Sequence, residues 1–280
     1  MRLGTIRTAD GTRAFRQIGE RTELLAATDV GALLRNPFLL QDPGEPIAAP
    51  AAHLLAPPVL APTKFLCAGL NYFEHAREVG KPAPQYPTLF AKLPNSIVGA
   101  AENIELPVPS VSERVDWEAE LVIVIGTRTR DVDEAGAARA IFGYTAMNDI
   151  SVRDWQKRTE EWLQGKNFDR TTPVGPVVVT VDEFDPADPH LVETLVGTES
   201  KQAGRTSDLI FSPAALVAYI AQFMTLEPGD LIATGTPAGV GSGRTPQEFL
   251  KDGDVVTTRI DGIGTLRNLC VIPAALTTRS

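Results

Sequence analysis

Two glutamates stand two residues apart where an apolar run begins, in the segment DWEAELVIVIG (116–126). Side chains alternate along a strand, so in a strand Glu118 and Glu120 would project from the same face. Two ionised carboxylates beside a buried strand repel each other and persist where a cation lies between them. A solvated acidic face on an edge strand explains the pattern as well, so these two residues alone do not establish a metal site.

A third carboxylate, Asp149, follows the apolar part of YTAMNDISVRDWQ (144–156). It is either a ligand of the same ion or the N-cap of a helix that we predict over 149–163. Three carboxylate ligands favour Mg²⁺, Mn²⁺ or Ca²⁺, and the chain has no Cys/His cluster that would indicate zinc. Magnesium would leave water-filled positions for a chelating substrate.

His75 and Glu78 are three residues apart in a predicted helical turn. At that spacing a carboxylate can orient an imidazole and raise its basicity, which suits a general base. A loop rich in glycine and proline follows (80–87) and could order over a ligand. A surface pair is the commoner meaning of this spacing, and it is the only interpretation for His53 and His190, which lie in proline-rich connections.

Three further polar residues follow Asp149 in the sequence. If the helix over 149–163 forms, Arg153 and Gln156 share a face with Asp149 and could grip an anionic substrate beside the metal. An ion pair between Asp149 and Arg153 within the helix is the plainer alternative. Lys166, in the turn GKNFD (165–169), is either solvated or directed at charge that develops on a reacting oxygen.

The glycine-rich segment GDLIATGTPAGVGSG (229–243) has a different meaning from a nucleotide loop. It lacks both the Gly-x-x-x-x-Gly-Lys-Ser/Thr pattern and a Gly-x-Gly-x-x-Gly that opens a helix, which argues against a dinucleotide site. A strand that ends at Gly235 and Thr236 instead suits a tight turn that offers backbone and hydroxyl donors to a ligand.

Charge and composition limit the partners. The 280 residues include 35 acidic and 26 basic side chains, for a net charge of −9 without a basic cluster, which argues against nucleic acid. The apolar runs are far shorter than the roughly 20 residues that span a bilayer, and the N-terminus lacks a signal peptide's apolar stretch. Cys67 and Cys270 stand far apart, which favours free thiols in a reducing compartment over a disulfide. We therefore expect a cytoplasmic protein without a membrane or nucleic-acid partner.

Six prolines in residues 41–63 mark an extended connection, so we place a domain boundary near residue 60. Residues 1–60 would then be a small N-terminal domain with its proline-rich linker, and residues 61–280 the catalytic domain. The N-terminal part is predicted to contain a strand near Leu3–Arg7 and a helix opened by Thr28 or Asp29.

Short runs rich in Val and Ile, bounded by turn residues, dominate the chain after residue 64. Helical periodicity is limited to 133–141, 149–163 and 212–224, the last with Ser212 as N-cap. The regular alternation of strand and helix that a doubly wound sheet requires is missing. We therefore predict an α+β fold in which strands dominate.

In order and spacing, these motifs resemble the fumarylacetoacetate hydrolase family from about Phe65 to Val271. The resemblance rests on GLNYFEHARE, FAKLPNSIVG, DWEAELVIVIG, GYTAMNDISVRDWQ, GKNFD, GDLIATGTPAGV and FLKDGDVV. One departure is LVGTESKQ (195–202), where many members have an Asn-Gly-Glu turn between two strands. The missing Asn weakens the usual hairpin signal.

The resemblance implies a fold and a set of roles. The family fold is a mixed β-sandwich roll, commonly paired into homodimers, and longer members carry a small N-terminal domain. Magnesium or a similar ion would be bound by Glu118, Glu120 and Asp149, and His75 with Glu78 would form the dyad of a mobile lid. The active-site lysine, the substrate-contacting arginine and glutamine, and the glycine–threonine wall would be Lys166, Arg153, Gln156, Gly235 and Thr236.

The implied reaction is hydrolysis of a C–C bond in an acylpyruvate-like substrate, a small anionic keto acid. The ion would hold the enolate while His75 activates water and Lys166 stabilises charge or delivers a proton. The nearest alternatives decarboxylate a β-keto acid such as oxaloacetate, or shift a double bond or a proton, as an isomerase or tautomerase does. From another class, the alternative is a non-catalytic, metal-stabilised binding protein, which would have no need for a base beside the ion.

Overall fold

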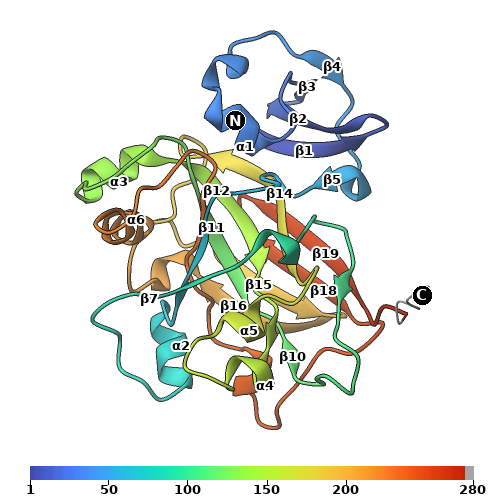
Figure 1. Cartoon of the computed structure of the whole chain (residues 1–280), viewed down its shortest axis with the longest axis vertical. Coiled ribbons are helices and arrows are strands. Elements are labelled where there is room, and N and C mark those ends of the chain that lie inside the picture. The colour runs from blue at the N-terminus through green and yellow to red at the C-terminus, as the bar shows by residue number, and fades with distance from the viewer. Residues whose placement is uncertain (275–280) are drawn as a thin grey trace, which may run out of the picture.

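The computed structural model describes residues 1–274, in which strands outnumber helices (Figure 1). The strands are β1 Arg2–Thr8, β2 Gly11–Ile18, β3 Arg21–Leu24, β4 Glu45–Ile47, β5 Leu55–Ala56, β6 Phe65–Gly69, β7 Thr88–Ala91, β8 Ile97–Val98, β9 Ile104–Glu105, β10 Val115–Asp116, β11 Ala119–Ile125, β12 Ile141–Asn148, β13 Ser151–Val152, β14 Thr172–Thr180, β15 Leu191–Val196, β16 Glu199–Arg205, β17 Leu231–Ala233, β18 Val255–Ile260 and β19 Gly264–Val271. The α-helices are α1 Val30–Arg35, α2 Phe73–Glu78, α3 Glu134–Ala140, α4 Arg153–Gln156, α5 Leu163–Lys166 and α6 Pro213–Ala221. Over these described residues, no helix is long and apolar enough to cross a bilayer.

The strands form two large mixed sheets and one short ribbon. The first sheet has 12 strands in the order β4-β3-β2-β1-β14-β12-β11-β17-β6-β7, with β5 beside β1 and β8 beside β14. The second has the order β16-β15-β18-β19-β9, and β10 pairs with β13 alone. The prediction of a strand-dominated α+β fold with mixed sheets is therefore confirmed.

Strand β11 is enclosed by the rest of the molecule along its whole length. All seven of its residues are buried, and it pairs antiparallel with β12 on one edge and β17 on the other. Leu121, Ile123 and Ile125 belong to the core shared with the second sheet and α6. Val122 and Val124 pack on the opposite face, in the cluster that contains α1. Because both faces are apolar and both edges are bonded, the end of this strand is held firmly in position.

The N-terminal residues extend the first sheet. Strands β1 to β4 and helix α1 form the blue unit at the top of Figure 1, and β1 pairs with β14 so that Leu3 lies opposite Val178. The predicted N-cap of α1 is present, because Asp29 accepts a hydrogen bond from Ala32 N at 2.5 Å. That residues 1–60 form a separate domain stays a prediction.

Two of the three later helices match their predictions, and one does not. Helices α3 and α6 lie within 133–141 and 212–224. The continuous helix predicted over 149–163 is wrong: residues 151–152 pair with β10, and only the short helices α4 and α5 follow. The residues directly after Asp149 form a strand instead of a helix, so Asp149 is not a helix cap.

Cys67 and Cys270 are both free and buried.

The hairpin between β15 and β16 forms despite its missing Asn. Val196 lies opposite Glu199, so the loop consists of Gly197 and Thr198. Gly197 has a φ of 61°, a left-handed conformation that glycine adopts without steric cost. Gly197 therefore allows the tight turn of the hairpin to form without the Asn that many family members have there.

Leu3 tests the contact between the N-terminal strands and the rest of the sheet. It is fully buried opposite Val178, so truncation leaves a cavity in the core. We expect Leu3→Ala to lower the free energy of unfolding by about 2–5 kcal/mol, measured by urea denaturation. Ile18→Ala is the control, because Ile18 is 57% exposed, and it should change stability by less than about 0.5 kcal/mol. Equal unfolding midpoints for the two variants would contradict the assignment.

Candidate active site

Three buried carboxylates meet where β11 begins and β12 ends. Glu118, Glu120 and Asp149 each offer one oxygen, and these oxygens lie within 4.8 Å of one another. Antiparallel pairing sets Ala119 opposite Asn148, and Asp149 N donates a hydrogen bond to Glu118 O at 2.8 Å. The strands thus bring Asp149 next to the two glutamates, although it follows Glu118 by 31 positions in the chain.

Two buried lysines contact this triad. Lys166 Nζ lies 2.6 Å from Glu118 Oε2 and 2.7 Å from Asp149 Oδ2. Lys92 Nζ lies 2.5 Å from Asp149 Oδ1, and neither lysine side chain is more than 2% exposed. Sequence reasoning identified Lys166 but missed Lys92. The available signal was a lysine inside the otherwise apolar start of FAKLPNSIVG.

Arg153 connects the triad to a fourth carboxylate. Its Nη2 lies 2.7 Å from Glu118 Oε1, its Nε donates to Asp116 Oδ1 at 2.5 Å, and its Nη1 donates to Gln156 Oε1 at 3.0 Å. Ser242 N donates to the other oxygen of Asp116 at 2.7 Å. Asp116 was not predicted, although the alternation that selected the two glutamates extends back to it. Arg153 and Gln156 thus reach the site without the long helix that was predicted to carry them.

The two glutamates of the triad have opposite electrostatic environments. Burial raises the pKa of Glu118, but the cations of Lys166 and Arg153 outweigh burial and hold the pKa at about 2. Burial also raises the pKa of Glu120, and there the neighbouring carboxylates of Asp149 and Glu118 raise it further. Glu118 is therefore a stable carboxylate, whereas the surroundings of Glu120 disfavour its ionised form.

Lys166 is held in its charged form. Burial lowers the pKa of its ammonium, but the carboxylates of Asp149 and Glu118 have the larger combined effect and raise the pKa above its ordinary value. The side chain is therefore a cation and a proton donor. It is not available as a base near neutral pH.

Glu120 provides the test of whether a metal ion fits. Its Oε2 accepts a hydrogen bond from Gly235 N at 2.8 Å, and among the ion pairs of residues 1–274 it has no cationic partner. A buried carboxylate without a cation is costly unless a ligand compensates for the charge. Three converging carboxylate oxygens with one uncompensated charge match the oxygen-rich coordination of a hard divalent cation. The predicted metal ligands therefore fit such an ion.

The His75–Glu78 pair approaches the same cavity from α2. His75 Nδ1 lies 2.8 Å from Glu78 Oε2, and the other oxygen of Glu78 accepts a hydrogen bond from Gly239 N at 2.9 Å. Although burial raises the pKa of Glu78, hydrogen bonds from His75 and Gly239 lower it below its ordinary value. Glu78 is therefore a carboxylate fixed at both oxygens, and it orients the imidazole.

The turn after β17 closes one wall of the site. Gly235 has a φ of 99°, and a Cβ there would lie 2.9 Å from Asn71 Cβ, so a larger residue does not fit. Thr236 Oγ1 donates to Ala119 O at 2.9 Å. Gln202, which sequence reasoning missed, accepts from Ala119 N at 2.9 Å and donates to Thr236 Oγ1 at 2.8 Å. This side chain fastens the wall to the metal-ligand strand.

The site opens into a cavity of about 300 Å³. Most of the predicted site residues line it directly, and the remaining three, Glu78, Asp149 and Gly235, contact lining residues from behind. The predicted residues on the wall are His75, Glu118, Glu120, Arg153, Gln156, Lys166 and Thr236. Aromatic walls that sequence reasoning missed come from Phe90 and Trp162, whose ring centroids lie 5.4 Å apart.

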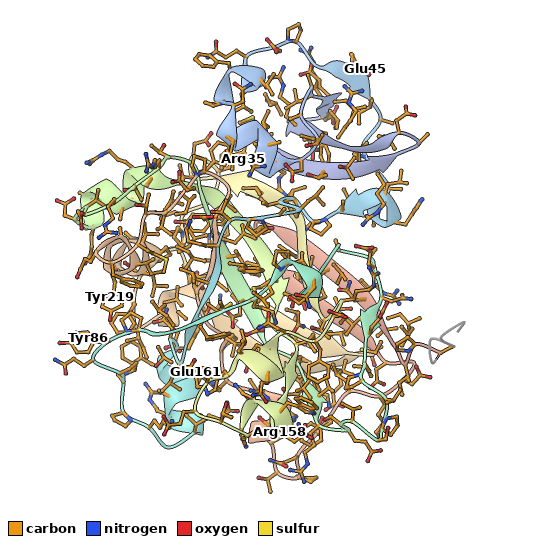
Figure 2. The ribbon with its side chains drawn as sticks, in the orientation of Figure 1. Arg35, Glu45, Tyr86, Arg158, Glu161 and Tyr219 are labelled. Carbon is orange, nitrogen blue, oxygen red and sulfur yellow. The ribbon has the colours of Figure 1, made fainter. Side chains whose placement is uncertain are left out.

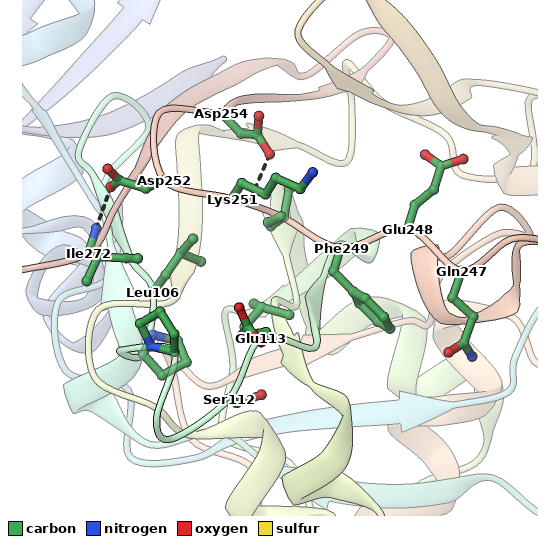
Figure 3. Close-up of a pocket in the computed structure, with 14 residues that line it drawn as sticks. Leu106, Ser112, Glu113, Gln247, Glu248, Phe249, Lys251, Asp252, Asp254 and Ile272 are labelled. Atoms are coloured by element: carbon green, nitrogen blue, oxygen red, sulfur yellow. Dashed lines mark hydrogen bonds between the residues drawn. The ribbon is translucent and has the colours of Figure 1, made fainter.

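A second cavity, of about 650 Å³, lies apart from these residues (Figure 3). Its charged lining is mainly acidic, with Glu113, Glu248, Asp252 and Asp254 against a single basic side chain, Lys251. Asp254 and Asp252 accept hydrogen bonds from the backbone N–H groups of Lys251 and Ile272. Despite its larger volume, it lacks the converging carboxylates, buried cations and imidazole of the smaller cavity.

Comparison with known proteins agrees with this arrangement. A family model described as the C-terminal domain of fumarylacetoacetate (FAA) hydrolase matches residues 64–271. Oxaloacetate tautomerase fahd2, mitochondrial, of Xenopus laevis is 42% identical over 218 residues, which cover 76% of this chain and 67% of that protein. The solved structure of fumarylacetoacetate hydrolase from Exiguobacterium antarcticum has 34% identity and a TM-score of 0.88, covering 98% of this chain and 100% of that one. The 2-hydroxyhepta-2,4-diene-1,7-dioate isomerase from Mycobacterium marinum has 37% identity and a TM-score of 0.76, covering 98% and 99%.

The matched stretch contains every predicted site residue, from His75 to Thr236. The structural likeness extends over nearly the whole chain and includes the N-terminal strands. The resemblance indicated by the motifs is thereby confirmed, and the chain belongs to the fumarylacetoacetate hydrolase family.

Proposed function

We propose that the protein is a metal-dependent enzyme that moves a proton at the carbon next to the keto group of a small 2-oxo acid, as a tautomerase or isomerase. One observation carries this proposal: His75, Glu118, Glu120 and Lys166 line a single cavity. Proton transfer at that carbon requires a base on one side of the substrate and stabilisation of negative charge on the other. The His75–Glu78 dyad would supply the base. The carboxylate triad with its bound ion, together with Lys166, would stabilise the negative charge.

Magnesium is the ion that suits this site best. Glu118, Glu120 and Asp149 would hold it, and three carboxylates leave coordination positions for water or substrate. When bound, the ion would act as a Lewis acid towards the carboxylate and keto oxygens of the 2-oxo acid.

The protein's own side chains have separable tasks. Glu78 occupies Nδ1 of His75, which leaves Nε2 of the imidazole to exchange a proton with the substrate. The ammonium of Lys166 stabilises charge on the keto oxygen, and the guanidinium of Arg153 with the amide of Gln156 orients the substrate carboxylate. Phe90 and Trp162 limit the access of water to the reacting carbon.

The names of the relatives favour a proton shift over bond cleavage, because one is an oxaloacetate tautomerase and another a dienedioate isomerase. Hydrolysis of a C–C bond, the first choice from the motifs, becomes the second candidate. The likeness to the Exiguobacterium antarcticum fumarylacetoacetate hydrolase favours it. It would use the same dyad to take a proton from water rather than from carbon.

Replacing His75 tests the role of the dyad. We expect His75→Ala to lower kcat for ketonisation of enol oxaloacetate about 10²- to 10⁴-fold, because general-base catalysis is lost, and to leave the affinity for Mg²⁺ unchanged. The assay follows the loss of enol absorbance together with deuterium uptake at C3 and released CO₂. His53→Ala, at an exposed histidine outside the cavity, is the control. Unchanged turnover in His75→Ala would remove the dyad from the mechanism, and CO₂ as the main product would favour decarboxylation.

Replacing Glu120 gives two effects of opposite sign. Loss of a direct ligand should weaken Mg²⁺ binding in Glu120→Gln by at least about 100-fold, since even outer contacts of metal sites contribute 10- to 100-fold. Without metal, the same variant should melt at or above the wild-type temperature, because a neutral amide replaces a carboxyl group whose ionised form is disfavoured by burial and by the neighbouring carboxylates. Titration calorimetry measures the first effect and thermal unfolding in chelator the second.

Glu113→Gln is the matched control for both measurements, because Glu113 is exposed in the second cavity (Figure 3). It should leave both the Mg²⁺ affinity and the metal-free melting temperature unchanged. If Glu120→Gln bound Mg²⁺ like the wild type, the three carboxylates would not be the metal ligands.

A further inference from the structure

Two lysines without a catalytic assignment, Lys81 and Lys157, line the same cavity as Glu118 and Lys166. Both are exposed, whereas Glu118 and Lys166 are buried. The cavity therefore runs from a buried end, where the carboxylate triad lies, to an exposed end with two ammonium groups.

Neither of these lysines is neutralised by the protein. Among residues 1–274, the ion pairs with an N···O distance of 4.0 Å or less include Lys92 and Lys166 but neither Lys81 nor Lys157. Each cation at the buried end, by contrast, contacts at least one carboxylate. The unpaired positive charge of the cavity is therefore concentrated at its exposed end.

Charges at the buried end nearly cancel. With all four carboxylates ionised, as a bound cation requires, they face three cations, which leaves one negative charge; the groups are Asp116, Glu118, Glu120, Asp149, Lys92, Arg153 and Lys166. A divalent ion would convert this remainder into one positive charge, which matches a single substrate carboxylate. No further positive charge would remain at the buried end to pair with a second carboxylate of the substrate.

The backbone of each lysine is held by a hydrogen bond to a neighbouring helix. Lys81 N donates to Ala76 O at 2.9 Å, and the connection that follows is supported where Tyr86 contacts Tyr219 of α6, with ring centroids 6.3 Å apart (Figure 2). Lys157 directly follows α4, and its N–H donates to Arg153 O at 3.2 Å. The two lysines thus line one cavity from two different segments, the α2–β7 connection and the residue directly after α4.

We propose that Lys81 and Lys157 bind the second carboxylate of a 2-oxo dicarboxylic acid and so select diacids over monoacids. This inference rests on the proposed function, because it takes the first carboxylate to lie at the triad. Exposed ion pairs are weak individually, so the two lysines confer preference without contributing to the chemical step.

The test compares 2-oxoglutarate with 2-oxopentanoate, which has the same carbon chain with a methyl in place of the distal carboxylate. Both are titrated calorimetrically into the Mg²⁺-loaded full chain. We expect the wild type to bind the diacid about tenfold more tightly. Lys81→Gln and Lys157→Gln should each weaken diacid binding about threefold to fivefold, and the double variant should abolish the preference, while monoacid binding stays within about twofold.

Two control variants separate charge recognition from other effects. Lys251→Gln removes an exposed lysine from the second cavity and should leave both affinities unchanged (Figure 3). The double variant with Lys81→Arg and Lys157→Arg keeps both charges and should keep the preference for the diacid. Equal loss of both ligands, or no loss of either, in the glutamine variants would overturn the inference.

Turnover of enol oxaloacetate by the wild type, measured separately, distinguishes this inference from the proposed function. Turnover together with a diacid preference that survives both glutamine substitutions rejects the role of the lysines alone. A diacid preference that depends on the lysines, without turnover of any 2-oxo acid, rejects the proposed reaction and retains the binding role.

Discussion

Mutual repulsion among three buried carboxylates is the constraint on which the rest of the site depends. Glu118 and Asp149 are compensated by lysines within 2.7 Å, but Glu120 has only a backbone N–H. The carboxylates cannot move apart, because β11 is buried on both faces and hydrogen-bonded along both edges. The fold therefore holds together three carboxylates whose joint ionisation is unfavourable. A divalent cation bound between them would relieve their repulsion, so the rigidity of the strand would favour metal binding.

The two halves of the site differ in how firmly they are packed. The seven residues of β11 are all buried, whereas α2, which carries His75 and Glu78, has a single buried residue, Ala76. The hydrogen bond from Gly239 N to Glu78 joins this lightly packed helix to the opposite wall. Elements with few buried contacts open at low free-energy cost. On the proposed function, substrate would enter past α2 while the carboxylates stay in register, and His75 would reach its position when the helix is docked.

Sequence patterns found the residues whose signal is local and missed those whose role depends on distant contacts. Period-two alternation selected Glu118 and Glu120, and motif order selected Asp149. Lys92 contacts a residue 57 positions away, and Gln202 contacts the backbone 83 positions away, so the neighbouring sequence does not identify either partner. Lys92 is unusual as a lysine in an apolar segment, but that signal alone does not indicate what it contacts. The helix predicted over 149–163 failed for the same reason, because residues 151–152 pair with a strand that the local pattern cannot reveal.

Different reactions and substrates on this scaffold follow from how its charges are distributed. The groups around the triad are buried and mutually paired, so replacing one of them leaves another charge without a partner and disturbs the fold. Lys81 and Lys157 are exposed and form no ion pair with residues 1–274, and they lie on the α2–β7 connection and directly after α4. On the proposed function, substrate preference would therefore change at the exposed end of the cavity, while the buried end would keep one arrangement for holding the ion and stabilising negative charge on a keto oxygen.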